Sequence, residues 1–242
     1  MKILILGGTT EARALANRLV ALGHDVTTSL AGRTQDPLLP QGNLRMGGFG
    51  GVQGLAAYLL GAQIEQLVDA THPFAGQMSR NAVAAAEAAN ISLLRLVRPA
   101  WEPALGDAWI YTQGTAEAAA ALPADACVLL TTGHAGLEHF LERGDCRFLV
   151  RIIEAPAAAL PAHARLLQIR PPFHLLDELA LMEREAITHL VTKNSGGTQT
   201  ASKLEAARRL GVKVIMIARP VYEPANEVAS VDEALVALGL TG

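Results

Sequence analysis

Short apolar runs alternate with helical patterns along nearly the whole chain, and this alternation constrains the fold more than any other feature. Continuous apolar strands that are separated by helices are typical of a parallel sheet with helices on both faces. The sequence therefore predicts an α/β protein. Its 242 residues have room for one large domain or for two smaller ones.

The predicted elements follow the same rhythm in both halves of the chain. Strands are predicted at residues 3–6, 25–30, 66–70, 91–97, 127–131, 147–153, 189–192 and 213–218. Helices are predicted at residues 10–22, 52–60, 75–89, 115–122, 136–142, 174–185 and 200–210. A last helix is expected to begin at Ser230, which forms an S-x-x-E capping box with Glu233.

A linker is predicted between the two halves. The stretch RPAWEPALGD has two prolines and interrupts the periodicity of the pattern. We therefore expect two Rossmann-like, doubly wound parallel-sheet lobes, at residues 1–99 and 100–242. A binding site is expected in the cleft between the lobes, since ligands of such sheets lie beyond the carboxyl ends of the strands.

Composition favours a folded chain without affinity for polyanions. Hydrophobic residues make up 50% of the sequence and aromatic residues 4%, and the net charge is -3. Because cations and stacking platforms are few, no nucleic-acid partner is expected. The chain begins with a strand pattern, and no apolar run approaches the ~20 residues of a membrane-spanning helix. We therefore expect neither a secretion signal nor membrane insertion.

Cysteine usage and missing motifs narrow the chemistry. Cys127 and Cys146 lie in apolar runs, where a free cysteine behaves as a small buried hydrophobe, so a reducing cytoplasm is the expected location. The patterns C-x-x-C, H-E-x-x-H and G-x-S-x-G are absent, which disfavours a structural zinc, a zincin and an ordinary α/β-hydrolase. No metal is expected, and the difficult step is assigned to a bound cofactor.

Five predicted strand ends are unusually polar or rich in glycine. The first, GGTTEA, comprises Gly7, Gly8, Thr9, Thr10 and Glu11 and then an alanine. It is similar to the dinucleotide fingerprint G-x-G-x-x-G/A, but Thr9 stands where the middle glycine should be. Threonine hydroxyls and helix-start amides could still bind phosphates here. The alternative is a plain turn between strand and helix.

The second strand end indicates which dinucleotide would bind. It offers Ser29, Gly32, Arg33 and Thr34, and it has no acidic residue. An NAD site usually places an acid here for the ribose 2′-hydroxyl, whereas a nearby arginine accommodates the 2′-phosphate of NADP. A bound dinucleotide is therefore expected to be NADP(H). The alternative for Arg33 is an ordinary solvated loop residue.

The third strand end is the run GGFGG at residues 47–51, which leads into a helix. So many glycines cost backbone entropy, and close approach of a ligand to Gly48 and Gly50 would explain them. The alternative is a flexible turn with Phe49 in the core.

The fourth strand end is VDATHPFA, where Thr71 and His72 end the strand and Pro73 suits the first turn of a helix. A histidine in such a loop can donate or accept a proton near neutral pH. The alternative is a structural histidine.

The fifth strand end, in the second lobe, is suited to an anionic ligand. Lys193 supplies a charge, Asn194 and Ser195 supply hydrogen-bond donors, and Gly196 and Gly197 expose amides. The spacing is not that of a Walker motif. A companion strand end with Thr132 and Gly133 could face this loop across the cleft.

Taken together, GGTTEA, GRT, GGFGG, ATHPFA, the Trp-containing linker after Arg98 and TKNSGG resemble the precorrin-6A reductase family of cobalamin biosynthesis. The resemblance covers almost the whole chain in the expected order. It implies two Rossmann-like lobes with NADPH and a tetrapyrrole between them. It also implies NADPH-dependent reduction of one double bond of precorrin-6A to give precorrin-6B, with the choice between metal-free and cobalt-containing substrate left open.

The resemblance also implies roles for the strand ends. The NADPH phosphates would lie on residues 7–11, the 2′-phosphate near Ser29, Arg33 and Thr34, and the nicotinamide toward Thr71 and His72. The carboxylates of the macrocycle could pair with Lys193, with the amides of residues 195–197, and with Arg13, Arg98 and Arg151. His72 and Lys193 are the candidates by position for delivering the proton.

Two other functions remain open. One is a non-catalytic redox sensor that binds NADPH, and the other is a methyltransferase that binds S-adenosylmethionine in the first lobe. The missing acid after the second strand weakens the methyltransferase hypothesis. We expect a monomer that makes at most transient contacts with neighbouring pathway enzymes.

Overall fold

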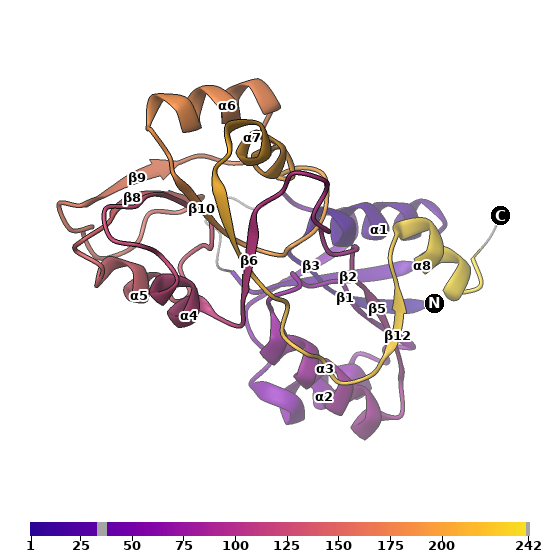
Figure 1. Ribbon diagram of the computed structural model, residues 1–242. Helices are drawn as coiled ribbons and strands as arrows, with labels where there is room; N and C mark the ends of the chain where they lie inside the picture. Colours follow the sequence, from indigo (N-terminus) through magenta and orange to yellow (C-terminus); the bar gives the residue numbers. More distant parts are fainter. Residues whose placement is uncertain (33–37, 241–242) are drawn as a thin grey trace. The chain divides into compact units, whose positions relative to one another are not determined.

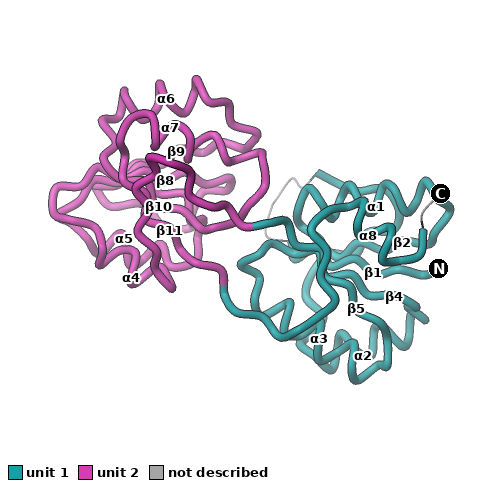
Figure 2. The backbone as a smooth tube through the Cα atoms, turned by 45° about the vertical axis from the view of Figure 1, so that its right-hand side comes forward, with its two compact units in different colours: residues 1–99, 220–242 teal, residues 100–219 magenta. Residues whose placement is uncertain are grey.

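The computed structural model describes residues 1–32 and 38–240 (Figure 1). The chain forms two compact units (Figure 2). Unit 1 contains Met1–Pro99 and Pro220–Gly242, and unit 2 contains Ala100–Arg219. In the described part of the chain, each unit has a six-stranded sheet in which every pairing is parallel. The predicted α/β class with two parallel-sheet lobes is confirmed.

The sheet of unit 1 has the strand order β12-β5-β4-β1-β2-β3. Its strands are β1 (Lys2–Leu6), β2 (Asp25–Leu30), β3 (Asn43–Met46), β4 (Gln66–Asp69), β5 (Ser92–Leu96) and β12 (Asn226–Val228). Helices α1 (Thr10–Ala21) and α8 (Val231–Ala237) cover one face, and α2 (Gly51–Gly61) and α3 (Gly76–Ala89) cover the other (Figure 1). Ile3 and Ile5 pack toward α1, while Leu4 and Leu6 pack toward α2 and α3.

The sheet of unit 2 has the strand order β6-β11-β10-β7-β8-β9. Its strands are β6 (Trp109–Thr112), β7 (Cys127–Leu130), β8 (Arg147–Ile152), β9 (Ala164–Gln168), β10 (His189–Lys193) and β11 (Lys213–Ile217). The helices are α4 (Thr115–Ala120), α5 (Leu137–Leu141), α6 (Leu175–Arg184) and α7 (Ser202–Leu210). Helices α6 and α7 pack on one face through a cluster that includes Leu129, Met182 and Leu190.

The predicted strands and helices are all present, with small differences at their ends. Four strands were not predicted, namely β3, β6, β9 and β12, and each lies at an edge of its sheet. The helix at the C-terminus begins as expected, because the hydroxyl of Ser230 accepts a hydrogen bond from the amide of Glu233 at 3.2 Å. Cys127 and Cys146 are buried free thiols, and burial raises the pKa of both.

The boundary between the units needs one correction. A single division near residue 100 would assign residues 220–242 to the second lobe, but these residues return to unit 1. The reason is that β12 pairs in parallel with β5, and α8 then packs its Ala234 and Leu235 on the sheet of unit 1. Among the described residues, none of the helices has the length and apolar character to cross a membrane.

Candidate functional site

The parallel sheet of unit 1 brings four of the five predicted loops to one edge. The carboxyl ends of β1, β2, β3 and β4 lie side by side because these strands are hydrogen-bonded neighbours. The fifth loop, at residues 193–197, follows β10 in unit 2. There it adjoins the end of β7, which carries Thr132 and Gly133.

The loop after β1 has the geometry of a tight, open turn. A Cβ atom on Gly7 would lie 2.8 Å from Cγ2 of Thr28, so packing against β2 requires glycine there. Gly8 has a φ of +109°, and no heavy atom of the described residues lies within 4 Å of the position that its Cβ would occupy. A ligand can therefore approach the backbone at Gly8.

Thr9 has a structural role that the sequence did not indicate. Its hydroxyl accepts a hydrogen bond from the amide of Ala12 at 3.0 Å and donates one to the carbonyl oxygen of Ala70 at 2.8 Å. Thr9 thus caps α1 and ties the first loop to the end of β4. This hydroxyl is used twice within the protein, so the predicted role of Thr9 in phosphate binding stays a prediction, as do those of Thr10 and the amides of the helix start.

The negative charge of Glu11 would repel an anion at the start of α1, but Arg98 balances this charge. Oε2 of Glu11 accepts a hydrogen bond from Nη1 of Arg98 at 2.8 Å, and both side chains are only partly exposed. Arg98 was expected to bind substrate, and the structure instead brings it to the predicted cofactor loop. The first turn of α1 therefore keeps the positive end of its dipole near the loop without an uncompensated carboxylate.

The glycine-rich loop before α2 is open and braced from one side. Gly50 is the N-cap of α2 and has a left-handed backbone. Within residues 1–32 and 38–240, no side chain caps α2 at Gly50, and nothing lies within 4 Å of a Cβ built on Gly48 or Gly50. Arg45 donates to the carbonyl oxygens of Gly47 at 2.6 Å and Gly48 at 2.9 Å. Its guanidinium lies 3.8 Å from the ring centroid of Phe49. Phe49 packs partly on the core, so that part of the alternative for this loop is right.

The loop after β2 is described only in part. Ser29 is buried at the end of β2, and its carbonyl oxygen accepts a hydrogen bond from the amide of Gly7 at 2.9 Å. Gly32 is exposed and has a φ of +73°. Arg33 and Thr34 lie outside the described residues. The predicted 2′-phosphate site therefore stays a prediction.

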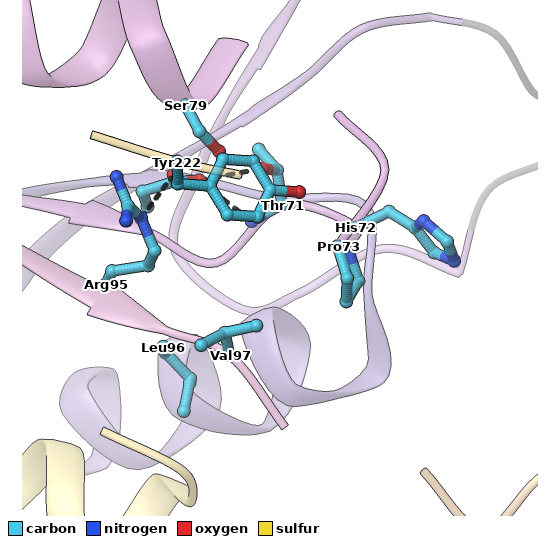
Figure 3. Close-up of a pocket in the computed structure, with 9 residues that line it drawn as sticks. Thr71, His72, Pro73, Ser79, Arg95, Leu96, Val97 and Tyr222 are labelled. Atoms are coloured by element: carbon cyan, nitrogen blue, oxygen red, sulfur yellow. Dashed lines mark hydrogen bonds and ion pairs between the residues drawn. The ribbon is translucent and has the colours of Figure 1, made fainter. Parts of the chain in front are cut away.

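The loop after β4 is shaped by a buried carboxylate. Oδ1 of Asp69 accepts hydrogen bonds from the amide of Thr71 at 3.2 Å and from its hydroxyl at 2.7 Å. Thr71, His72 and Pro73 line a cavity of about 10 Å³ together with Arg95 and Tyr222 (Figure 3). This volume is close to that of one water molecule. The imidazole of His72 points away from the cavity (Figure 3).

The hydrogen bonding of His72 limits how it can donate a proton. Its Nδ1 accepts a hydrogen bond from the backbone amide of Phe74 at 3.2 Å. An acceptor nitrogen carries no proton, so the neutral ring holds its proton on Nε2. His72 can therefore offer a hydrogen bond or a proton to a ligand through Nε2 alone.

In unit 2, the loop after β10 is held by side chains. The side-chain amide of Asn194 accepts from the backbone amide of Trp101 at 2.7 Å and donates to its carbonyl oxygen at 2.9 Å. The indole of Trp101 donates to the carbonyl oxygen of Gly197 at 2.9 Å. Arg219 donates to the carbonyl oxygens of Asn194 at 2.8 Å and Ser195 at 3.1 Å. Asn194 therefore holds the loop, and its amide has two partners within the protein.

The other predicted substrate residues of unit 2 differ in their access to a ligand. Lys193 is half-buried at the end of β10, and Gly196 and Gly197 have φ values of +68° and +80°. Gly133 is half-buried, but Thr132 is 3% exposed, so its hydroxyl is not available at the surface. Gly133 is the better candidate at this strand end.

Arg151 is buried in an ion pair. Its Nη1 lies 2.5 Å from Oε1 of Glu178, and its guanidinium lies 4.1 Å from the ring centroid of Phe173. The predicted pairing of Arg151 with substrate therefore competes with a partner that the fold already supplies. Arg13, in contrast, is half-buried one turn into α1 of unit 1.

Sequence reasoning did not select Arg45, Asp69, Arg95, Trp101 or Arg219. Three of these could have been found by the same rule that found the loops, because Asp69 ends β4 and Arg45 and Arg219 lie within two residues of the end of β3 and β11. The role of Trp101 depends on a contact that spans more than ninety residues, which no local pattern reports. In the described ranges, no group of three or more His, Cys, Asp or Glu residues could hold a metal ion.

The donor set at the edge of unit 1 fits a dinucleotide. The fit rests on the open backbone at Gly8, the start of the 12-residue helix α1, and the charge balance between Glu11 and Arg98. Near the end of β2 and β3, the open glycines at Gly48 and Gly50 leave room for the rest of such a ligand.

Comparison with known proteins gives a consistent result. The family model described as precorrin-6x reductase CbiJ/CobK matches residues 2–239. The precorrin-6A reductase of Rhodococcus erythropolis is 47% identical over 243 residues, which cover 100% of this chain and 97% of the relative. The cobalt-precorrin-6A reductase of Priestia megaterium is 30% identical and covers 98% of this chain and 97% of the relative.

A solved structure described as CobK precorrin-6A reductase has the same fold. It matches with a TM-score of 0.94 and 40% sequence identity, and the match covers 99% of this chain and 96% of that chain. Both lobes and the order of their strands are therefore shared. By sequence and by fold, this chain belongs to the precorrin-6x reductase CbiJ/CobK family.

Proposed function

We propose that this protein is an NADPH-dependent precorrin-6A reductase of cobalamin biosynthesis. The observation that carries the proposal is the edge of unit 1, where the open backbone of Gly8 meets the start of α1. Membership of the family supplies the reaction, because its relatives along the full chain are precorrin-6A and cobalt-precorrin-6A reductases.

The cofactor is held by backbone groups of unit 1. The amides of Gly8, Thr10 and Glu11 bind the diphosphate at the positive end of α1, with Arg98 balancing Glu11. The loop that contains Ser29, Arg33 and Thr34 takes the 2′-phosphate, which makes the enzyme selective for NADPH. Thr71 and Nε2 of His72 would lie on the side of the nicotinamide and would hold it through hydrogen bonds.

The substrate carboxylates are bound by unit 2. Lys193, Gly133 and the amides of residues 195–197 lie at two neighbouring strand ends of its sheet. The identity of 47% to a precorrin-6A reductase, against 30% to a cobalt-precorrin-6A reductase, favours the metal-free macrocycle as substrate. That the macrocycle lies in a cleft between the lobes stays a prediction, as do the monomeric state and the cytoplasmic location.

The reaction needs a hydride and a proton. When bound, NADPH supplies the hydride to one ring carbon, and a proton joins the neighbouring carbon so that one double bond becomes a single bond. His72 can deliver that proton only from Nε2, and Lys193 is the other candidate. Each exposed pair with a carboxylate adds about 1 kcal/mol or less, so recognition depends on several such pairs together with burial of the ring.

The test is oxidation of NADPH by the purified protein with precorrin-6A. We expect one NADPH oxidised for each macrocycle reduced, with a strong preference over NADH. Arg33→Glu should weaken NADPH far more than NADH, whereas Arg18→Glu, which alters an exposed arginine paired with Asp232, should change neither.

Three outcomes would contradict the proposal. Equal use of NADPH and NADH would contradict the assignment of the 2′-phosphate to the loop after β2. A thermal shift with NADPH but none with the tetrapyrrole would favour the redox sensor. Tight retention of labelled S-adenosylmethionine would favour the methyltransferase.

A further inference from the structure

Behind the loop of Thr71 and His72 lies a chain of ionic contacts that joins Asp69, Arg95 and Glu227. Nε of Arg95 lies 3.5 Å from Oδ2 of Asp69, and the two side chains are 3% and 1% exposed. Nη1 of Arg95 lies 2.7 Å from Oε1 of Glu227 on the edge strand β12. Charges this buried are costly to desolvate, so a pair of apolar residues would serve a purely structural role at least as well.

The carboxylate of Asp69 has two different partners. While Oδ2 faces Arg95, Oδ1 accepts both the amide and the hydroxyl of Thr71. The same side chain therefore fixes the backbone direction and the side-chain rotamer of the residue next to His72. The guanidinium attracts the carboxylate electrostatically, at 3.5 Å and without a hydrogen bond between them, and so favours the orientation in which Oδ1 faces Thr71.

The far side of Arg95 is tied to the segment by which the chain returns to unit 1. Nη1 also donates to the carbonyl oxygen of Glu223 at 3.0 Å, and the guanidinium lies 5.1 Å from the ring centroid of Tyr222. Tyr222, Arg95 and Thr71 surround the same small cavity (Figure 3). A loop at residues 70–73 is thus supported by residues 222–227, far along the sequence.

We propose that Asp69 is a positioning residue of the reductase, which holds Thr71 and His72 in place for the nicotinamide, and that Arg95 and Glu227 keep Asp69 oriented. This inference rests on the proposed function, since it concerns the loop to which the nicotinamide is assigned. Because Asp69 is 1% exposed and bonds Thr71, it acts through Thr71. A supporting shell of this kind matters because small displacements of positioning groups reduce rate strongly.

Unit 2 supplies a matched control. Its pair of Arg151 and Glu178 is buried to the same degree, at 5% and 2% exposure, and also joins an arginine of a central strand to a carboxylate. Among the described residues, the side chain of Glu178 bonds Arg151, and both lie in unit 2, whereas the loop of Thr71 belongs to unit 1. Glu178→Gln therefore disturbs a buried ion pair without disturbing the loop of Thr71.

The experiment measures three quantities for each variant: the Kd of NADPH by calorimetry, kcat with precorrin-6A, and Tm. Asp69→Ala should raise the Kd or lower kcat by about tenfold to a hundredfold. Asp69→Asn, which retains an oxygen for Thr71, should have a smaller effect. Glu178→Gln should lower Tm while the Kd of NADPH stays unchanged.

Thr71 tests the route by which Asp69 acts, even where Asp69→Ala fails to fold. Thr71→Ser keeps the hydroxyl and should behave as the wild type, whereas Thr71→Val should be impaired. The double variant Asp69→Asn with Thr71→Val should be no worse than Thr71→Val alone, because valine already removes the hydroxyl bond and asparagine keeps an oxygen for the amide of Thr71.

The inference would be overturned if the Asp69 variants lowered Tm as Glu178→Gln does but left Kd and kcat unchanged, or if Thr71→Ser and Thr71→Val behaved alike. A wild-type protein that binds NADPH without reducing precorrin-6A would instead contradict the proposed function, and the comparison of Kd values would still decide the role of Asp69. A wild-type protein that does not bind NADPH would overturn both.

Discussion

Each unit has its own six-stranded parallel sheet, but the candidate site loops are open in unit 1 and held by side chains in unit 2. In unit 1 the loops at Gly8 and Gly50 are open, so a ligand meets backbone amides. In unit 2 the loop after β10 is tied down by Trp101, Asn194 and Arg219. Open amides at helix starts suit a diphosphate, whereas a braced loop that carries Lys193 suits carboxylates, which need charges at fixed positions.

The largest expected effect concerns Arg151, for which the fold and the sequence suggest different roles. Arg151→Met leaves Glu178 buried without its partner and should cost about 3–5 kcal/mol in the free energy of unfolding. The double variant Arg151→Met with Glu178→Leu should recover most of this loss, as measured by urea unfolding. If the double variant is stable and retains its KM for precorrin-6A, Arg151 does not bind substrate. A raised KM would restore the predicted role.

Removing the side chain that holds the loop after β10 in unit 2 should give the next largest effect. Asn194→Ala removes the side-chain partner of the part-buried amide and carbonyl of Trp101, which should cost about 1 kcal/mol of stability for each hydrogen bond lost. We expect the KM for precorrin-6A to rise while the Kd of NADPH stays the same. An equal change in both constants would show that the two units do not divide the ligands between them.

A smaller effect is expected at the open turn of unit 1. Gly8→Ala places a side chain on a residue with a φ of +109°, which should cost about 1–2 kcal/mol. Because no described residue lies within 4 Å of the new methyl group, we expect it to interfere mainly with a bound ligand. The Kd of NADPH measured by calorimetry should rise more than Tm falls. A fall in Tm with an unchanged Kd would mean that the turn is structural.

The smallest expected effect concerns the pH dependence of stability in unit 2. Burial, together with the charge of the neighbouring Lys213, lowers the pKa of His189 in unit 2. The unfolded chain, with a pKa of about 6.5, then binds more protons than the folded chain as the pH falls, so stability is lost below about pH 6.5. His189→Gln should reduce this acid-induced fall in Tm and leave Tm near pH 8 little changed. An unaltered pH profile would contradict this assignment.

The central part of each sheet could be predicted from sequence, and the edges could not. Strands such as β1 and β7 are covered on both faces and therefore appear as continuous apolar runs. The edge strands β3 and β12 are mostly exposed, so their residues carry no such run. For the same reason, the sequence did not show that residues 220–242 return to unit 1. The return depends on the pairing of β12 with β5, and β12 has no apolar run.

The positions of the candidate site loops at the strand ends could be predicted from the sequence, whereas the partners of their side chains could not. The rule that ligands bind at strand ends located the loops at Gly8 and His72. It could not tell that the side chain of Asn194 is used by Trp101, or that Arg98 reaches Glu11, since both contacts join residues far apart in the sequence. Local patterns therefore indicate where a site lies, and only the fold shows which side chains remain available to a ligand.

We assign NADPH to unit 1 and the substrate carboxylates to unit 2. The most direct test of this assignment is a crystal structure of the protein with NADPH bound. We expect the diphosphate against the amides of Gly8 and Thr10, at the start of α1, and the nicotinamide beside Thr71 and His72. A diphosphate bound at the loop of Lys193 and Gly197, or anywhere else than the carboxyl edge of the unit 1 sheet, would contradict it.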